Sequence, residues 1–185
     1  MSDPDRNEVW SSFLSTWPPD RVRQMKLEEY TNPNKDDAFI YWLEARLDKL
    51  GSIWGGSAFK FGIYCRDNVG AREASGGRIW GEKYAWLKKF GGTELEAFAT
   101  IRGRLGEVLD AVRDGMIARI DEIDLAPVLK WKVAFLYQDR AKPVLLPVFK
   151  KEMLFFGYRA IDPRARLGNT PYHVMYETLL ERHRG

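Results

Sequence analysis

The chain has 185 residues, of which 45% are hydrophobic and 30% are charged, and its net charge is +3. This is the balance of an ordinary globular protein that can bury a core without crosslinks. The one cysteine excludes an internal disulfide, and with only two histidines a Cys/His zinc site cannot be assembled. The N-terminus is polar and no apolar run approaches the roughly 18 residues of a membrane span, so we expect a cytoplasmic protein with no membrane partner.

The first third of the chain predicts helices. Apolar residues at helical spacing indicate helices over residues 7–16, 20–30 and about 36–50. Pro18-Pro19 ends the first helix, because proline cannot continue it. Asp36 or Asp37 can cap the third helix at its N-terminus, and Gly51 stands where a C-terminal cap is expected.

The period then changes to two, which is typical of half-buried strands. Alternation over residues 58–66 places Phe59, Phe61, Ile63 and Cys65 on one face and Lys60, Gly62, Tyr64 and Arg66 on the other. Residues 67–77 are rich in glycine, serine and charge and predict a loop. Residues 79–90 predict a second extended stretch, which Gly91-Gly92 ends.

The second half begins with the clearest helix signal. Thr93 and Glu96 form a capping-box pattern, and apolar residues continue at helical spacing to Val112. Residues 129–137 alternate as a strand does, although a helix stays open. Residues 144–149 predict a short edge strand because of Pro147. Residues 150–158 and 170–182 predict helices.

These elements predict an α+β fold, a small and mostly antiparallel sheet flanked by several helices. We expect a single domain over 1–185. Its parts are a helical lead-in over 1–35, a core over 36–158 and a basic helical segment over 159–185.

No complete catalytic motif is present. The nearest approach to a phosphate-binding loop, Gly51 to Ser57, has no lysine in place. His173 and His183 are not near a nucleophile elbow, and neither extended stretch carries the acid-x-lysine tripeptide of restriction-type nucleases. We therefore predict a binding module with no catalytic residues, metal or cofactor.

Aromatic residues are interleaved with basic ones in three places, and this pattern is typical of nucleic-acid binding. Rings stack on bases, at about 1–3 kcal/mol each, and cations neutralise phosphates. The expected nucleic-acid-binding residues are Lys60, Tyr64, Arg66, Lys83, Lys88, Lys130 and Lys132, with the lysines and the arginine on phosphates. Trp54, Trp80 and Trp86 are the expected base-stacking residues. The alternative is that the rings form the core and the lysines only face water.

Several segments together resemble a known family. They are Leu27–Asn32, Phe39–Glu44, Leu50–Tyr64, Tyr84–Trp86 and Trp131–Gln138. They resemble the N-terminal region that precedes the AAA+ motor in McrB-like proteins of modification-dependent restriction systems. The likeness covers roughly residues 27–154, and the chain carries no Walker motif of its own.

The resemblance implies a DNA-recognition role in antiviral defence, in which a methylated or otherwise modified base is flipped into an aromatic pocket. It also implies an AAA+ motor and a nuclease, in cis or in trans, as partners. Two other hypotheses stay open. One is a protein–protein interaction domain of a defence complex, which predicts an exposed apolar patch. The other is an enzyme with an unfamiliar site.

Overall fold

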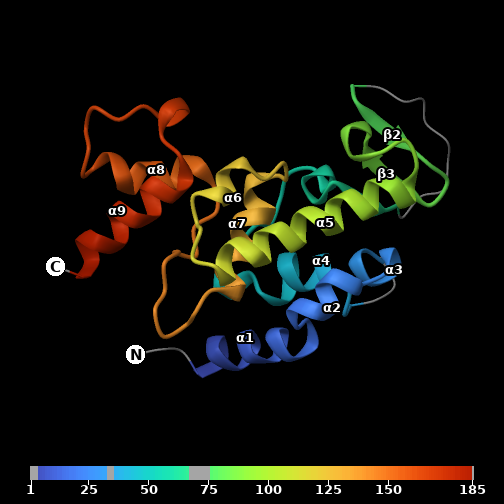
Figure 1. Cartoon of the computed structure of the whole chain (residues 1–185), viewed down its shortest axis with the longest axis horizontal. Helices are drawn as coiled ribbons and strands as arrows, with labels where there is room; N and C mark the ends of the chain where they lie inside the picture. Colours follow the sequence, from blue (N-terminus) through green and yellow to red (C-terminus); the bar gives the residue numbers. More distant parts are fainter. Residues whose placement is uncertain (1–3, 33–35, 67–75, 185) are drawn as a thin grey trace.

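The computed structural model describes residues 4–32, 36–66 and 76–184, and it shows an α+β fold. Helices α5 and α7 lie at the centre, a three-stranded sheet lies at one end, and the helices α8 and α9 lie at the other (Figure 1). The sheet order is β1-β3-β2, and both pairs are antiparallel. The predicted fold class is therefore confirmed.

The α-helices are α1 (Pro4–Thr16), α2 (Pro19–Gln24), α3 (Leu27–Tyr30), α4 (Phe39–Tyr41), α5 (Glu94–Arg113), α6 (Arg119–Glu122), α7 (Pro127–Tyr137), α8 (Lys151–Arg159) and α9 (Tyr172–Arg184). The strands are β1 (Ile63–Cys65), β2 (Arg78–Trp80) and β3 (Tyr84–Leu87). Shorter turns are the π-helical η1 (Trp42–Arg46) and the 3₁₀ helices η2 (Asp48–Leu50), η3 (Ala58–Phe61), η4 (Lys88–Phe90) and η5 (Leu167–Asn169).

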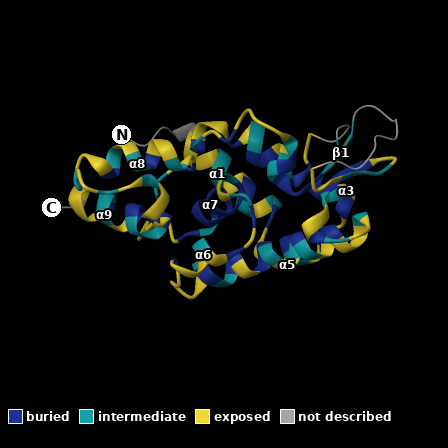
Figure 2. Cartoon of the chain, turned by 90° about the horizontal axis from the view of Figure 1, so that it is seen from above, coloured by how far each residue is buried: buried dark blue, intermediate teal, exposed yellow. Residues whose placement is uncertain are grey.

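Helices α5 and α7 form the centre of the core. The predicted capping box opens α5, since the Thr93 hydroxyl accepts from Glu96 N and the Glu96 carboxylate accepts from Thr93 N. Residues 129–137, which the sequence left open, are helical, and Pro127 occupies the first turn of α7. Every residue from Leu129 to Leu136 is buried, as the dark centre of Figure 2 shows. A helix buried all round shows no amphipathic period, which explains the strand-like pattern.

The N-terminal helices pack on this core. The predicted helix over 7–16 is confirmed as α1, whereas the predicted helix over 20–30 is divided into α2 and α3. Met25 and Lys26 have extended backbone angles between them. Helix α3 is fixed to the sheet side by Tyr30, whose hydroxyl donates to Phe61 O at 2.6 Å.

The predicted helix over 36–50 consists of α4, η1 and η2, and the predicted cap is wrong. Ala38 is the N-cap residue and makes no side-chain cap bond, while Asp36 and Asp37 are exposed. Gly51 ends the segment at φ +96°, where a Cβ would lie 2.5 Å from Pro147 O. Both the backbone angle and the close approach therefore require glycine.

The sheet is shorter than the sequence predicts. In the predicted strand over 58–66, the first four residues form η3, because the Ser57 hydroxyl accepts from Phe59 N. Gly62 then turns the chain into β1 at φ +81°, where a Cβ would lie 2.6 Å from Ile101 Cδ1. The predicted extended stretch over 79–90 contains β3, η4 and all of β2 except its first residue, Arg78. Most of the predicted loop over 67–77 lies outside the described residues.

The predicted strand over 144–149 is wrong. Its backbone groups bond to side chains instead of a neighbouring strand. The Gln138 amide oxygen accepts from Val144 N and Leu145 N, each at 2.8 Å. Tyr176 donates to Val148 O at 2.7 Å and Tyr172 donates to Phe149 O at 3.1 Å. Because side chains satisfy these groups, the segment is extended without a sheet partner.

The C-terminal helices α8 and α9 confirm the helices predicted over 150–158 and 170–182. Trp131 of α7 stacks on Tyr172 of α9, with ring centroids 5.3 Å apart. The Asp121 carboxylate accepts from the backbone N–H groups of Tyr172 and His173 and lies 2.7 Å from His173 Nδ1. His173 thus has a structural role at the start of α9.

Candidate nucleic-acid interface

The two faces of the sheet differ in chemistry. Directly paired residues of antiparallel strands share a face. Ile63 pairs with Trp86, which pairs with Ile79, and this face belongs to the hydrophobic core. Tyr64 pairs with Ala85, which pairs with Trp80, on the opposite face. Tyr64 and Trp80 are half-buried, so this second face keeps aromatic surface accessible.

Phe59 organises the second face. Its ring lies between Tyr64 and Trp80, with centroid distances of 5.2 Å and 5.3 Å and nearly perpendicular planes. Arg78 places its guanidinium 4.8 Å from the Phe59 ring centroid, and Arg66 lies 5.5 Å from that of Trp80. We call Phe59, Tyr64, Arg66, Arg78 and Trp80 the sheet platform. It alternates aromatic planes with cations on one surface.

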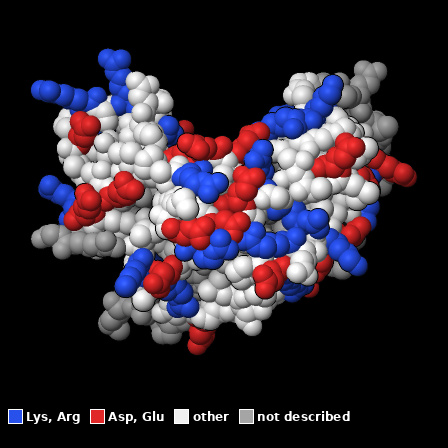
Figure 3. Space-filling view, in the orientation of Figure 1, with Lys and Arg blue, Asp and Glu red and all other residues white. Residues whose placement is uncertain are grey.

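Two further lysines border the sheet platform. Lys83 and Lys88 are exposed at the two ends of β3. The neighbouring Tyr84 phenol raises the pKa of the Lys83 ammonium, and this ammonium lies 5.2 Å from the Tyr84 ring centroid. Figure 3 shows both blue and red side chains over the sheet end of the molecule. Four cations, Arg66, Arg78, Lys83 and Lys88, thus accompany the rings.

A hollow of about 260 Å³ lies beside the sheet platform and shares Tyr64 with it. Its other walls include Tyr41, which is 40% exposed, and the polar side chains of Thr31, Asn32 and Glu44. The volume is slightly below the range of about 300–1,000 Å³ that holds drug-sized ligands. The hollow therefore suits a single planar ring.

The glycine-rich loop over 51–57 is held by Lys60. The Lys60 ammonium donates to Ile53 O and Gly55 O, each at 2.8 Å, and pairs with Glu44. Trp54 in this loop is 65% exposed, so it can stack on a ligand. Lys60 was expected to contact phosphate. Its ammonium instead holds the glycine-rich loop in place.

The expected basic cluster at 130–132 is wrong, because its side chains are inside the protein. Lys130 donates to Asp121 O and Ile123 O at 2.8 Å, and Lys132 donates to Leu47 O at 2.7 Å and to Gly51 O. Burial lowers the pKa of Lys132 to about 7, an effect that Asp48 opposes. Trp131 is fully buried between these lysines.

The expected base-stacking role of Trp86 is also wrong, because its ring is buried. It is 5% exposed, and its indole N–H donates to Gly91 O at 3.1 Å. Of the three tryptophans expected to stack, the structure leaves Trp54 and Trp80 accessible. Of the seven expected nucleic-acid-binding residues, it brings Tyr64, Arg66, Lys83 and Lys88 together at the sheet.

Sequence reasoning missed Arg78, Phe59 and Tyr41. Arg78 stands two residues before Trp80, and the strand period of two places both on one face. That signal was readable from the sequence. Tyr41 lies between two buried aromatic residues, Phe39 of α4 and Trp42 of η1, and no local pattern distinguishes it.

The described residues contain no group of three or more His, Cys, Asp or Glu side chains arranged to hold a metal ion. Within the same ranges, none of the helices combines the length and the apolar character that crossing a membrane requires. Comparisons with protein families, with curated proteins and with solved structures found no match to this chain.

Proposed function

We propose that this chain is a nucleic-acid recognition module whose sheet platform binds the backbone and bases of its target. The observation that carries the proposal is the alternation of Tyr64 and Trp80 with Arg66 and Arg78 on one sheet face. Aromatic planes accept stacked bases of any sequence, and adjacent cations neutralise phosphates. Aromatic rings and cations that are accessible on one surface can contact the bases and the phosphates of the same strand.

The hollow next to the sheet platform gives the proposal a place for one base. A base entering between Tyr41 and Tyr64 would meet Asn32 and Glu44, which supply amide and carboxylate groups to its polar edge. Unstacking a base costs a few kcal/mol, which contacts with both rings would offset. Glu44 also lines a second cavity, and Trp54 lies in the wall of that cavity.

The resemblance to the N-terminal region of McrB-like proteins supplies the biological setting of the proposal. In that setting the target is DNA carrying a modified cytosine, and the chain acts in the cytoplasm. An AAA+ motor and a nuclease, joined to the chain or supplied separately, would carry out the later steps. We assign no catalytic role to the chain itself.

Fluorescence anisotropy with labelled oligonucleotides tests the proposal. Methylated and unmodified, single- and double-stranded 12-mers are titrated with the protein at low salt. We expect saturable binding, a loss of about tenfold in the Arg78→Ala/Lys83→Ala double variant, and weaker binding as salt rises. Arg104→Ala/Lys142→Ala is the control, since it removes the same charge outside the sheet.

No binding of any oligonucleotide at tens of micromolar protein would refute the proposal. An equal loss in the control variant would also refute it, because net charge rather than the sheet platform would then explain binding. A preference for the methylated strand would support the narrower assignment to a modified base.

A second candidate function is protein interaction, which one observation favours. Met153 and Phe156, one turn apart on α8, are 65% and 82% exposed. Large exposed apolar side chains on neighbouring positions of one helix are typical of interfaces. Met153→Ser/Phe156→Ser should leave oligonucleotide binding unchanged and should abolish any concentration-dependent association seen by sedimentation velocity.

A further inference from the structure

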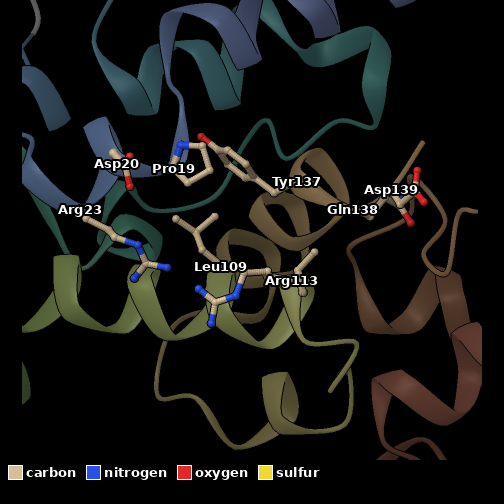
Figure 4. A pocket seen from close by; sticks show the side chains of 9 residues that line it. Pro19, Asp20, Arg23, Leu109, Arg113, Tyr137, Gln138 and Asp139 are labelled. Atoms are coloured by element: carbon tan, nitrogen blue, oxygen red, sulfur yellow. The ribbon is translucent and has the colours of Figure 1, made fainter. Parts of the chain in front are cut away.

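A cavity larger than the hollow lies away from the sheet, between α2, α5 and the end of α7. Its volume is about 490 Å³. Pro19, Leu109, Val112 and Tyr137 supply apolar surface to its wall. Figure 4 shows Asp20 and Asp139 toward opposite ends of this cavity, with Leu109 and Tyr137 between them. We call it the α2–α5 cleft.

The two arginines of the α2–α5 cleft are already paired. Arg23 donates to both oxygens of Asp110, at 2.9 Å and 3.3 Å. Arg113 lies 2.8 Å from Asp110 and 2.9 Å from Asp114. Two guanidinium groups therefore face two carboxylates, and this side of the cleft carries no excess charge.

Asp20 and Asp139 differ from this neutral network. Within the described residues, no Lys, Arg or His nitrogen lies within 4.0 Å of the Asp20 or Asp139 carboxylate. Asp20 comes from the first turn of α2, and Asp139 follows α7. The cleft therefore has two uncompensated negative charges on separate elements, joined by apolar surface.

The Asp139 end of the cleft is held in place before any ligand binds. Gln138 is 4% exposed, and its side-chain amide bonds to the backbone of Val144 and Leu145. The Asp139 carboxylate accepts from Ala141 N at 2.9 Å, which fixes its orientation with one oxygen bonded. A preformed rim reduces the entropy lost on binding.

We propose that the α2–α5 cleft binds an aliphatic diamine or polyamine, with one ammonium at each carboxylate and the alkyl chain over Leu109 and Tyr137. Such a ligand matches both features at once, since its ends are cationic and its middle is apolar. The Tyr137 ring also offers a face to a cation. The chain's net charge of +3 disfavours unspecific attraction of a polycation, so binding must come from a local site. This inference is independent of nucleic-acid binding.

Isothermal titration calorimetry of the whole chain tests the inference. The probes are 1,4-diaminobutane and spermidine, and butylamine at matched ionic strength is the single-cation control. We expect one equivalent of diamine to bind more tightly than butylamine. Asp20→Asn/Asp139→Asn should weaken diamine binding by about tenfold, because each exposed ion pair contributes a factor of about two to five.

The matched control is Asp36→Asn/Asp37→Asn, which removes the same charge from exposed residues outside the cleft. It should bind diamines as the unsubstituted chain does. The inference is overturned if diamines do not bind, if butylamine binds equally well, or if both double variants lose the same affinity. Arg78→Ala/Lys83→Ala should leave diamine binding intact, so failure of the proposed function would be separately visible.

Discussion

Helix α7 and the sheet platform contain the same kinds of residue in opposite surroundings. In α7, Trp131 stands between Lys130 and Lys132, and all three are buried. On the sheet platform, Trp80 lies beside Arg66 and Arg78 and remains accessible. The α7 lysines donate only to backbone carbonyls, while Arg78 lies over the Phe59 ring and Arg66 lies over Trp80 and also donates to Gly81 O. A ring flanked by cations therefore stabilises the fold in one region and is available to a ligand in the other.

The largest expected difference between the two regions concerns the tryptophans. Trp131 is fully buried and contacts Tyr172 and Tyr176, so Trp131→Ala should lower the free energy of unfolding by about 3–5 kcal/mol. Trp80→Ala should cost much less, about 1–2 kcal/mol, because the ring is half in water. Urea unfolding measures both, and equal losses would contradict the comparison.

The buried ammonium of Lys132 comes next. Lys132→Met should cost about 2–4 kcal/mol, because the carbonyls of Leu47 and Gly51 lose their donor inside the protein. Lys88→Met, at an exposed lysine next to the sheet, is the matched control and should change stability by less than about 0.5 kcal/mol. A Lys132→Met protein as stable as its control would show that these carbonyls find other donors.

The same lysine predicts a pH dependence. Its pKa is lowered from 10.5 to about 7 by burial, so between these values the unfolded chain binds one more proton than the folded protein. Stability should then rise with pH from about 7 to 10, by at most about 1.4 kcal/mol per unit. The rise should be absent in Lys132→Met, and chemical unfolding at pH 7, 8 and 9 measures it. A flat difference between the two proteins would show that Lys132 keeps an ordinary pKa.

The smallest expected effect on stability concerns Arg78 of the sheet platform. Arg78→Ala should change the free energy of unfolding by less than about 0.5 kcal/mol, since the side chain is exposed. Its effect should appear in binding, as a loss of about 3- to 10-fold. The slope of log affinity against log salt should also fall by about 0.7–0.9, the contribution of one phosphate contact. An unchanged slope would remove Arg78 from the interface.

Local signals predicted much of the fold, and the failures have physical causes. The capping box at Thr93 and Glu96 marked the start of α5, because both partners lie within one turn. Pro127, in the first turn of α7, was a start signal that the prediction did not use, and burial of the helix on all sides concealed its helical period. The strand expected over 144–149 was wrong because side chains bond its backbone, and two of these, Tyr172 and Tyr176, lie over twenty residues away in the sequence.

The candidate site was predictable only where the strand period applies. Tyr64 and Arg66 share a face by spacing, and so do Arg78 and Trp80. The sequence did not reveal that Lys60 holds the glycine-rich loop or that Lys132 reaches Gly51, which is 81 residues away. A lysine reads the same in the sequence whether its side chain is buried or exposed, so only its tertiary contacts distinguish the two roles.

Four tyrosine hydroxyls limit the stability of this fold at alkaline pH. Tyr30, Tyr137, Tyr172 and Tyr176 donate to the carbonyls of Phe61, Trp17, Phe149 and Val148. Burial raises the pKa of each phenol, so the native protein retains protons that the unfolded chain releases above about pH 10. A phenolate accepts hydrogen bonds but cannot donate them. Strong base should therefore detach the ends of α1, α3 and α9 from the core together, which makes loss of structure cooperative in hydroxide.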